Sequence, residues 1–128
     1  GFTHVVVGKV IATEPHPNAD KLCVATVTDG TENFQVVCGA PNCRKDLLTA
    51  FAKIGAVLPD EEDKTFKVKK SKIRGVESYG MLCSEKELKI SDRDEGIIEF
   101  GPDMVLGTDL ASYYSDAIFE ISLTPNLG

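Results

Sequence analysis

The sequence predicts a β-rich fold, a small barrel or sandwich followed by a short α+β extension. Three runs rich in β-branched and apolar residues, at 4–11, 22–27 and 34–38, each end at turn-forming residues. Three short strands at this spacing are typical of a meander, which commonly builds a barrel or a sandwich. A chain of 128 residues has the length of one domain and can bury a core without disulfides.

Turn signals separate these first three strands. Pro15 and Pro17 lie within 14–17, where neither a strand nor a helix can continue. Asp29-Gly30 is a strong turn pair after the second strand. The third strand ends at 39–42, which reads Gly-Ala-Pro-Asn. We therefore expect a stiff loop between the first two strands and a tight turn before the third.

Residues 47–54 fit two interpretations. Leu, Ala and Lys favour a helix by intrinsic propensity. The segment is bounded by Asp46 and Gly55, however, and is short for a helix but ordinary for a strand. We predict a strand here.

The segment 66–74 is also predicted to be a strand, with a change of phase inside it. Phe66 and Val68 share one face, whereas Ile73 has the opposite parity. Such a shift is what a β-bulge produces, and bulges bend strands around barrel corners. A basic cluster therefore lies on a kinked strand.

Beyond Gly80 the pattern changes to short mixed elements. Ser84 and Glu87 have the spacing of a capping box, which predicts one helical turn over 84–88. The remaining expected elements are a strand at 97–100, a helix at 108–114 and a strand at 118–123. The acidic stretch at 92–103 marks a seam, so we expect a core at 1–90 and an extension at 91–128 packed on it as one structural unit.

The net charge of the chain excludes a protein whose whole surface binds polyanions. Fourteen Lys and Arg against twenty Asp and Glu give a net charge of −6, whereas such proteins are usually basic. A local exception lies in 64–74, which has six cations and no acid: Lys64, Lys67, Lys69, Lys70, Lys72 and Arg74. Any nucleic-acid site must therefore be this patch on an acidic body.

Other classes of function find little support in the sequence. The four cysteines lack a C-x-x-C spacing, and with two histidines they form no zinc pattern, so we expect reduced structural thiols. There is no phosphate-binding glycine loop and no catalytic constellation. No apolar run is long enough to cross a bilayer, and no leader opens the chain, which favours the cytoplasm. Because the chain lacks an initial Met, we expect it to be a piece of a longer protein.

Three motifs occur in a characteristic order: HPNADKL at 16–22, VCGAPN at 37–42 and KIRGVESYGML at 72–82. Together they resemble the tRNA-binding domain family that is named for endothelial monocyte-activating polypeptide. The resemblance extends over roughly 4–90 and implies an oligonucleotide-binding (OB) fold, a closed five-stranded barrel. It also implies that the chain binds tRNA.

Within this family, GMLCSEKEL at 80–88, the acidic stretch and LTPN at 123–126 resemble the amino-terminal region of bacterial phenylalanine–tRNA ligase beta chains. Leu127-Gly128 departs from the Arg that usually follows there. The resemblance implies an accessory segment of a cytoplasmic enzyme of alpha and beta chains. Its partners would be tRNA, the alpha chain and the remaining beta-chain domains. ATP, Mg²⁺ and phenylalanine would serve aminoacylation in the alpha chain, so the segment itself would be no enzyme and would hold no cofactor or metal.

The predicted RNA contacts combine phosphate-binding cations with hydrogen-bond donors. The cations are Lys69, Lys70, Lys72 and Arg74, and the donors are Asn18, Lys21 and Ser78. The other motif positions are expected to shape the backbone: Pro17, Asp20, Gly39, Pro41, Asn42, Gly75, Gly80 and Met81. Asn18 and Lys21 fit a merely rigid loop equally well, Ser78 fits a turn, and Met81 fits the core.

Two alternatives remain open from the sequence. The acids at 60–63 directly precede the basic run and could neutralise it, leaving a solvated charged edge that keeps sheets from associating. The segment would then be a structural module that braces a synthetase, in keeping with few aromatic residues for base stacking. A free-standing tRNA-binding protein of the same fold is the third possibility.

Overall fold

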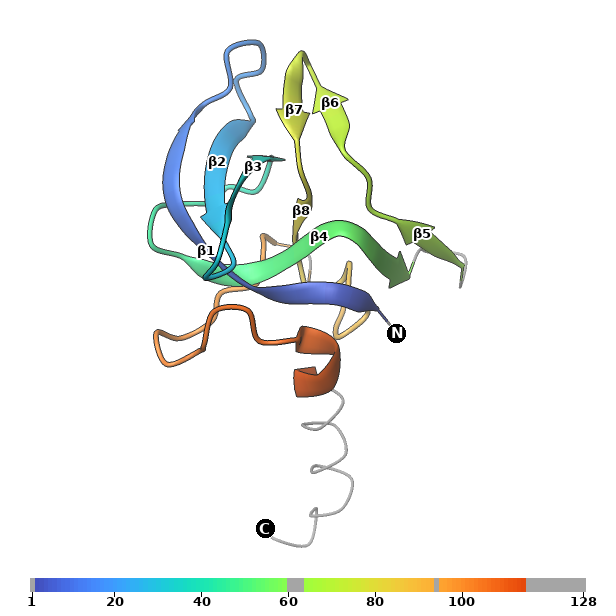
Figure 1. The fold of residues 1–128 in the computed structure, drawn as a ribbon. Coiled ribbons are helices and arrows are strands. Elements are labelled where there is room, and N and C mark those ends of the chain that lie inside the picture. The colour runs from blue at the N-terminus through green and yellow to red at the C-terminus, as the bar shows by residue number, and fades with distance from the viewer. Residues whose placement is uncertain (1, 60–63, 94, 115–128) are drawn as a thin grey trace, which may run out of the picture.

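Two β-sheets form the framework of the molecule in a computed structural model, which describes residues 2–59, 64–93 and 95–114 (Figure 1). The larger sheet has the strand order β3-β2-β1-β4-β5, with β8 paired to β4, and the smaller ladder is the hairpin β6-β7. The strands are β1 (Thr3–Pro15), β2 (Cys23–Thr28), β3 (Asn33–Cys38), β4 (Leu48–Pro59), β5 (Thr65–Lys67), β6 (Ser71–Ile73), β7 (Val76–Ser78) and β8 (Met81–Cys83). The ladders in both sheets are antiparallel.

The strands predicted at 4–11, 22–27, 34–38 and 47–54 are confirmed as β1 to β4. β4 runs further than expected, through Gly55, whose φ of 96° lets the strand bend there. Its first half pairs with β1 and its last residues pair with β5. One long strand therefore joins two parts of the sheet, as the curved ribbon of β4 shows in Figure 1.

The single bulged strand predicted at 66–74 is wrong. The segment is divided into β5, which pairs with β4, and β6, which pairs with β7. Val68 lies between them and is buried, and its backbone hydrogen-bonds Ala56 O at 2.7 Å and Gly55 N at 2.8 Å. The phase change in the sequence therefore marks the residue at which the chain turns into the core.

The expected closed five-stranded barrel is also not what the described residues form. The path of the larger sheet ends at β3 and β5, and no ladder among the described residues joins these two strands. β3 instead meets the 77–79 segment through separate hydrogen bonds, which are described below. The fold is mostly β, with an open sheet.

Residues 84–93 and 95–114 pack on the sheet with little regular structure. Ser84 and Glu87 make both hydrogen bonds of a capping box, at 2.7 and 3.2 Å, yet 85–89 form turns instead of a helix. In place of the strand predicted at 97–100, only Phe100 bridges to Leu48. Residues 110–114 are helical, within the predicted helix, and the strand predicted at 118–123 lies outside the described residues.

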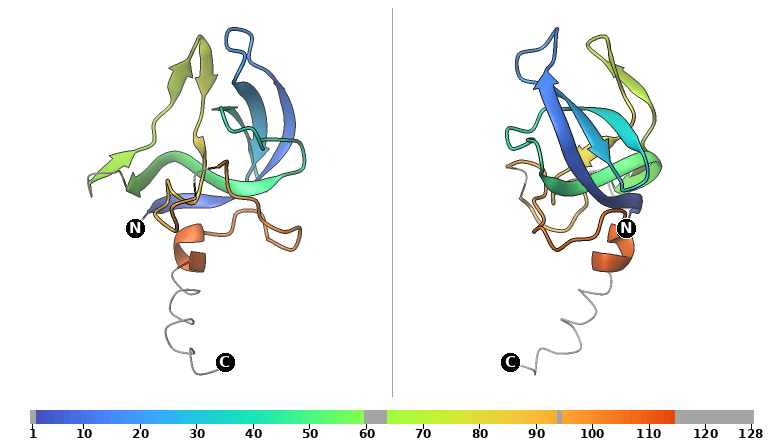
Figure 2. Two further views of the ribbon diagram at one scale, coloured as in Figure 1. Left: turned by 180° about the vertical axis from the view of Figure 1, so that it is seen from behind. Right: turned by 60° about the vertical axis from the view of Figure 1, so that its left-hand side comes forward.

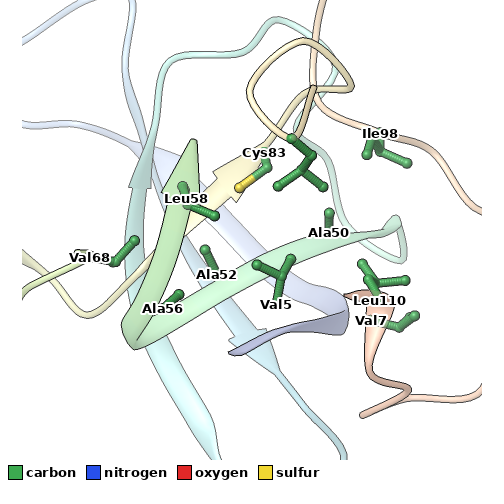
Figure 3. Packing of buried hydrophobic residues seen from close by; sticks show 11 residues of the cluster. Val5, Val7, Ala50, Ala52, Ala56, Leu58, Val68, Cys83, Ile98 and Leu110 are labelled. Atoms are coloured by element: carbon green, nitrogen blue, oxygen red, sulfur yellow. The ribbon is translucent and has the colours of Figure 1, made fainter. Parts of the chain in front are cut away.

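The core consists of two clusters, which share β4: Ala50 and Ala52 belong to the first and Phe51, between them, to the second. Figure 3 shows the first cluster, in which Ile98 and Leu110 from the carboxyl part pack with Val5, Leu58 and Cys83 from the strands. The second cluster has these buried members: Val10, Ala25, Val27, Val36, Cys38, Leu47, Phe51, Leu82 and Ile97. Burial of this apolar surface stabilises the framework by about 25 cal/mol for each Å². No helix among the described residues is long and apolar enough to cross a membrane.

Candidate nucleic-acid interface

The β6-β7 hairpin carries Arg74 at its tip. Ile73 pairs with Val76 in the register, which leaves a two-residue turn of Arg74 and Gly75. Their φ angles of 52° and 89° are both positive, as a type I′ turn requires. Gly75 adopts this geometry without strain, whereas Arg74 is held in it by the hairpin. The arginine side chain is thereby exposed at the outermost point of the turn.

The loop between β1 and β2 is fastened to this hairpin. His16 is buried, and its Nε2–H donates to the carbonyl oxygen of Ile73 at 2.9 Å, while its Nδ1 accepts the backbone N–H of Asn18 at 2.9 Å. The amide of Asn18 in turn donates to the carbonyl oxygen of Arg74 at 2.8 Å. Figures 1 and 2 show the loop and the hairpin next to each other in every view. The two segments form one surface, which we call the tip (residues 16–22 and 69–76).

The base of the hairpin is fastened to β3. The side-chain amide of Gln35 donates to the backbone carbonyl of Glu77 at 2.8 Å. The backbone carbonyl of Gln35 accepts the N–H of Tyr79 at 2.7 Å. The Ser78 hydroxyl accepts the Val37 N–H at 3.0 Å and donates to the Gly80 carbonyl at 3.0 Å. Ser78 is 1% exposed, so its hydroxyl holds this seam together and is turned away from solvent.

The predicted cations fall on two faces of the chain. Lys69 lines a groove together with Ser71 and Ile73, and successive side chains of a strand alternate between faces. Lys72 therefore lies on the opposite face of β6. Lys69, Lys72, Arg74 and Lys21 are all exposed, and none of them forms an ion pair with any residue in 2–59, 64–93 or 95–114. These four charges are available to an anion.

Lys70 has partners within the chain. Its Nζ lies 3.0 Å from Glu77 Oε2 and 5.8 Å from the centre of the Tyr79 ring. The hydrogen bond raises the pKa of Lys70 and lowers that of the Glu77 carboxyl. Lys72 stands opposite Glu77 in the register and adds to the lowering. The acid that partly neutralises the basic run is thus Glu77, while the acids at 60–63 lie outside the described residues.

A groove of about 960 Å³ opens beside the tip, between β5-β6 and β8. Phe66, which is 43% exposed, and the half-buried Met81 contribute apolar walls. The charged residues of its lining are Lys67, Lys69, Lys86, Glu87, Lys89 and Glu95. The groove therefore combines apolar surface with an excess of positive charge, a combination that suits nucleotides.

The remaining motif residues shape the backbone around the groove. A Cβ on Gly80 would lie 2.6 Å from the Phe51 ring and 2.7 Å from the Ala52 carbonyl, so only glycine fits there. The side-chain amide of Asn42 accepts the N–H of Ile97 at 3.0 Å and donates to its C=O at 2.8 Å. These two bonds connect the loop after β3 to the carboxyl part of the chain. Gly39 and Pro41 line the groove, and Pro17 and Asp20 are exposed in the first loop.

Sequence reasoning missed several residues that organise this surface. It assigned His16 to a rigid loop, yet this side chain joins that loop to the hairpin. The pairing of Glu77 with Lys70 and the lining role of Phe66 were not predicted either. No local signal in the sequence pointed to this contact, because His16 and Ile73 are 57 positions apart.

Fold and surface together define a β-rich module that presents unpaired cations beside a partly apolar groove. The chain belongs to the tRNA-binding domain family, since the family described as "Putative tRNA binding domain" matches residues 5–109. This confirms the resemblance seen in the three motifs.

Curated relatives are similar over the whole chain. The phenylalanine–tRNA ligase beta subunit of Protochlamydia amoebophila is 62% identical over 128 residues, and that of Pseudomonas putida is 54% identical over 129. The similarity covers 100% and 99% of this chain, but only 16% of each relative. The chain thus spans about one sixth of the length of these subunits.

Two solved structures share the fold. The MetRS-related protein of Pyrococcus horikoshii matches with a TM-score of 0.59 at 22% identity, over 84% of this chain and 88% of that one. The carboxyl-terminal domain of Plasmodium vivax p43 matches with a TM-score of 0.58 at 17% identity, over 84% of this chain and 58% of that one.

Proposed function

We propose that this chain is the accessory tRNA-binding segment of a phenylalanine–tRNA ligase beta subunit, and that the tip is its RNA-binding surface. The observation that carries the proposal is the fastening of two loops into one exposed surface with unpaired cations. Lys21, Lys69, Lys72 and Arg74 are exposed and in no ion pair among the described residues, so a polyanion can reach them although the chain as a whole is acidic.

Each tip residue has a role in this proposal. Lys69, Lys72, Arg74 and Lys21 meet phosphates, and the exposed Asn18 adds a hydrogen bond. Lys70 contributes less, because Glu77 already binds it. Ser78 supports the surface from beneath without touching RNA. Contacts of this kind position an RNA without reading its sequence, so the segment discriminates little between tRNAs.

The proposal extends to the longer protein of which this chain would be a segment. By similarity it is a cytoplasmic aminoacyl-tRNA synthetase in which this segment adjoins other beta-chain domains and an alpha chain. ATP and Mg²⁺ belong to the aminoacylation centre elsewhere in that enzyme. Residues 2–59, 64–93 and 95–114 contain no cluster of three or more His, Cys, Asp or Glu that could hold a metal.

The experiment is tRNA binding measured over a range of salt concentrations. The variant Lys69/Lys72/Arg74→Ala is compared with Lys9/Lys45/Arg93→Ala, which removes equal charge outside the tip. Three lost phosphate contacts should flatten the log–log salt slope by roughly 2 to 3, whereas the control should keep the slope of the wild type. Equal slopes for both variants would reject the tip and favour the module that braces the synthetase, the alternative suggested by the net charge of −6.

A further inference from the structure

The groove between β5-β6 and β8 continues from the tip. Lys69, Ser71 and Ile73 belong to the tip and also line the groove, so a strand that is held at the tip can enter it. Much of the rest of the lining comes from the segment 80–89. The lining includes four lysines against two glutamates, on a chain whose net charge is −6. The groove is therefore a basic surface that is continuous with the tip.

Phe66 gives this groove an aromatic surface. Its side chain is 43% exposed, although it lies on β5 opposite the buried Leu58 of β4. The half-buried Met81 lines the groove from β8. An exposed aromatic ring beside cations is the arrangement on which proteins stack unpaired bases, because every base has a π-face. Bases that are paired inside a duplex cannot reach such a ring, so the arrangement suits single-stranded RNA.

Lys89, which also lines the groove, occupies a backbone position that glycine usually fills. Its φ is 59°, its N–H bonds Lys86 O at 3.1 Å, and the N–H of Ile90 bonds Glu85 O at 2.9 Å. These are the hydrogen bonds of a Schellman motif, in which the left-handed residue is most often glycine. The Lys89 side chain is exposed and forms no ion pair with another described residue. Backbone strain at a residue whose side chain has no such partner in the fold points to a function of that side chain.

Arg74 at the tip shares this unusual backbone. The non-glycine residues with positive φ in the described ranges are His4, Asp46, Arg74 and Lys89. His and Asp adopt the left-handed conformation more readily than most residues, whereas Arg and Lys have no such preference. The two remaining residues are both cations, one at the tip and one at the groove. This pattern indicates that both positions serve the binding of one anionic ligand.

We propose that the groove binds an unpaired segment of the RNA that the tip holds, with a base stacked on Phe66 and phosphates at Lys69 and Lys89. The exposed Lys67 lines the groove as well and adds a further cation. The inference rests on the proposed function, because the tip and the groove hold the same RNA. It adds a requirement that phosphate contacts at the tip do not impose, namely that the RNA is single-stranded where it enters the groove.

Fluorescence tests the stacking directly. The sequence contains no tryptophan, so Phe66→Trp introduces a single indole into the groove. A base that stacks on the indole should quench its emission, and the probe is an oligouridylate of about eight nucleotides. We expect quenching by this strand and by tRNA, but not by a blunt RNA duplex of equal phosphate number. Tyr113→Trp is the matched control, because Tyr113 is 41% exposed and does not line the groove, and its emission should stay unchanged.

Binding of labelled tRNA is followed by anisotropy in parallel, so that the groove and the tip are judged separately. Binding of tRNA with unchanged emission from the Phe66→Trp chain would reject the groove and leave the proposed function standing. Quenching by the oligouridylate without any binding of tRNA would reject the proposed function and still support the groove. Equal quenching by polyglutamate of matched charge would overturn the inference, because the groove would then take acidic chains in general.

Substitutions give a second readout. Phe66→Ala should lower the affinity for the oligouridylate about five- to 150-fold, whereas Phe66→Tyr should retain it. Lys89→Gly should flatten the log–log salt slope for this strand by roughly 0.7. Its melting temperature should equal or exceed that of the wild type, because glycine adopts the left-handed conformation without strain. Lys45→Ala removes the same charge outside the tip and the groove and should keep the slope. A wild-type slope in the Lys89→Gly chain would overturn the phosphate contact at Lys89.

Discussion

The imidazole Nε2 of His16 lies 2.9 Å from the carbonyl oxygen of Ile73, and this hydrogen bond holds the first loop against the β6-β7 hairpin. The His16 side chain is buried, and its Nδ1 accepts the backbone N–H of Asn18, so both ring nitrogens are used within the fold. The tip is therefore pre-arranged, and an RNA need not order it on binding.

Replacing His16 should loosen the tip and weaken RNA binding together. His16→Ala leaves the Ile73 carbonyl without its donor, which should lower the free energy of unfolding by about 1–3 kcal/mol. Asn18→Ala removes an exposed bond and should cost less stability. Urea unfolding measures the loss of stability, and tRNA affinity under folding conditions measures the loss of RNA binding. Wild-type affinity in a folded His16→Ala chain would show that the arrangement of the loop does not matter to RNA.

Gly80 should tolerate no side chain. In Gly80→Ala the new Cβ would overlap the Phe51 ring and the Ala52 carbonyl, and φ is 140°. Gly55→Ala is the matched control, since its φ of 96° is also positive but no atom lies within 4 Å of the new Cβ. We expect Gly80→Ala to lose about 1–3 kcal/mol more than Gly55→Ala, because overpacking is added to backbone strain. Equal losses in thermal unfolding would mean that the core accommodates the methyl group.

Acid should weaken the fold through Asp29. This carboxylate is 7% exposed, lies 2.8 Å from Lys53 Nζ and accepts the N–H groups of Thr31 and Glu32. The hydrogen bond from Lys53, followed by those from the turn, lowers its pKa well below the ordinary value. Its stabilisation is therefore complete above the ordinary Asp value of about 3.9 and is lost as the pH falls below that value.

The variant Asp29→Asn isolates this contribution. It should be less stable than the wild type at pH 7, and the difference should shrink progressively below about pH 4. Urea unfolding at several pH values measures it. A difference that stays constant down to the acid limit would show that the lost stability comes from the turn geometry and not from the ionised carboxylate.

Glu77 should restrain RNA binding. Glu77→Gln releases Lys70 and removes the one carboxylate within 69–78, so tRNA affinity should rise about two- to threefold at low salt and less at high salt. Asp103→Asn makes the same charge change on an exposed residue of the carboxyl part and should leave the affinity nearly unchanged. Equal gains in both variants would indicate an effect of net charge alone.

The parts of the fold that the sequence predicted are those set by local pattern. Strands β1 to β4 follow from apolar runs and turn residues within each segment. The division of 66–74 depends on Val68 bonding Gly55 and Ala56 and is invisible in the segment itself. The 76–83 strands were missed because each has three residues, too few to show a period.

The candidate site divides in the same way. Charge alone singled out Lys69, Lys72 and Arg74, and all three are exposed in the structure. It could not show that Lys69 faces a groove, that Glu77 engages Lys70, or that Ser78 is buried in a seam. These facts depend on which strands pair, and that pairing is set by contacts far apart in the sequence.

Lysine footprinting of the chain with and without tRNA examines the tip in a single measurement. Acetylation followed by mass spectrometry should show protection of Lys21, Lys69 and Lys72 on binding. Lys9 and Lys45, which lie beside a second cavity lined by Arg44 and Glu99, should react equally in both states. Protection of Lys9 and Lys45 with free reaction at the tip would contradict the account and move the RNA to the other face.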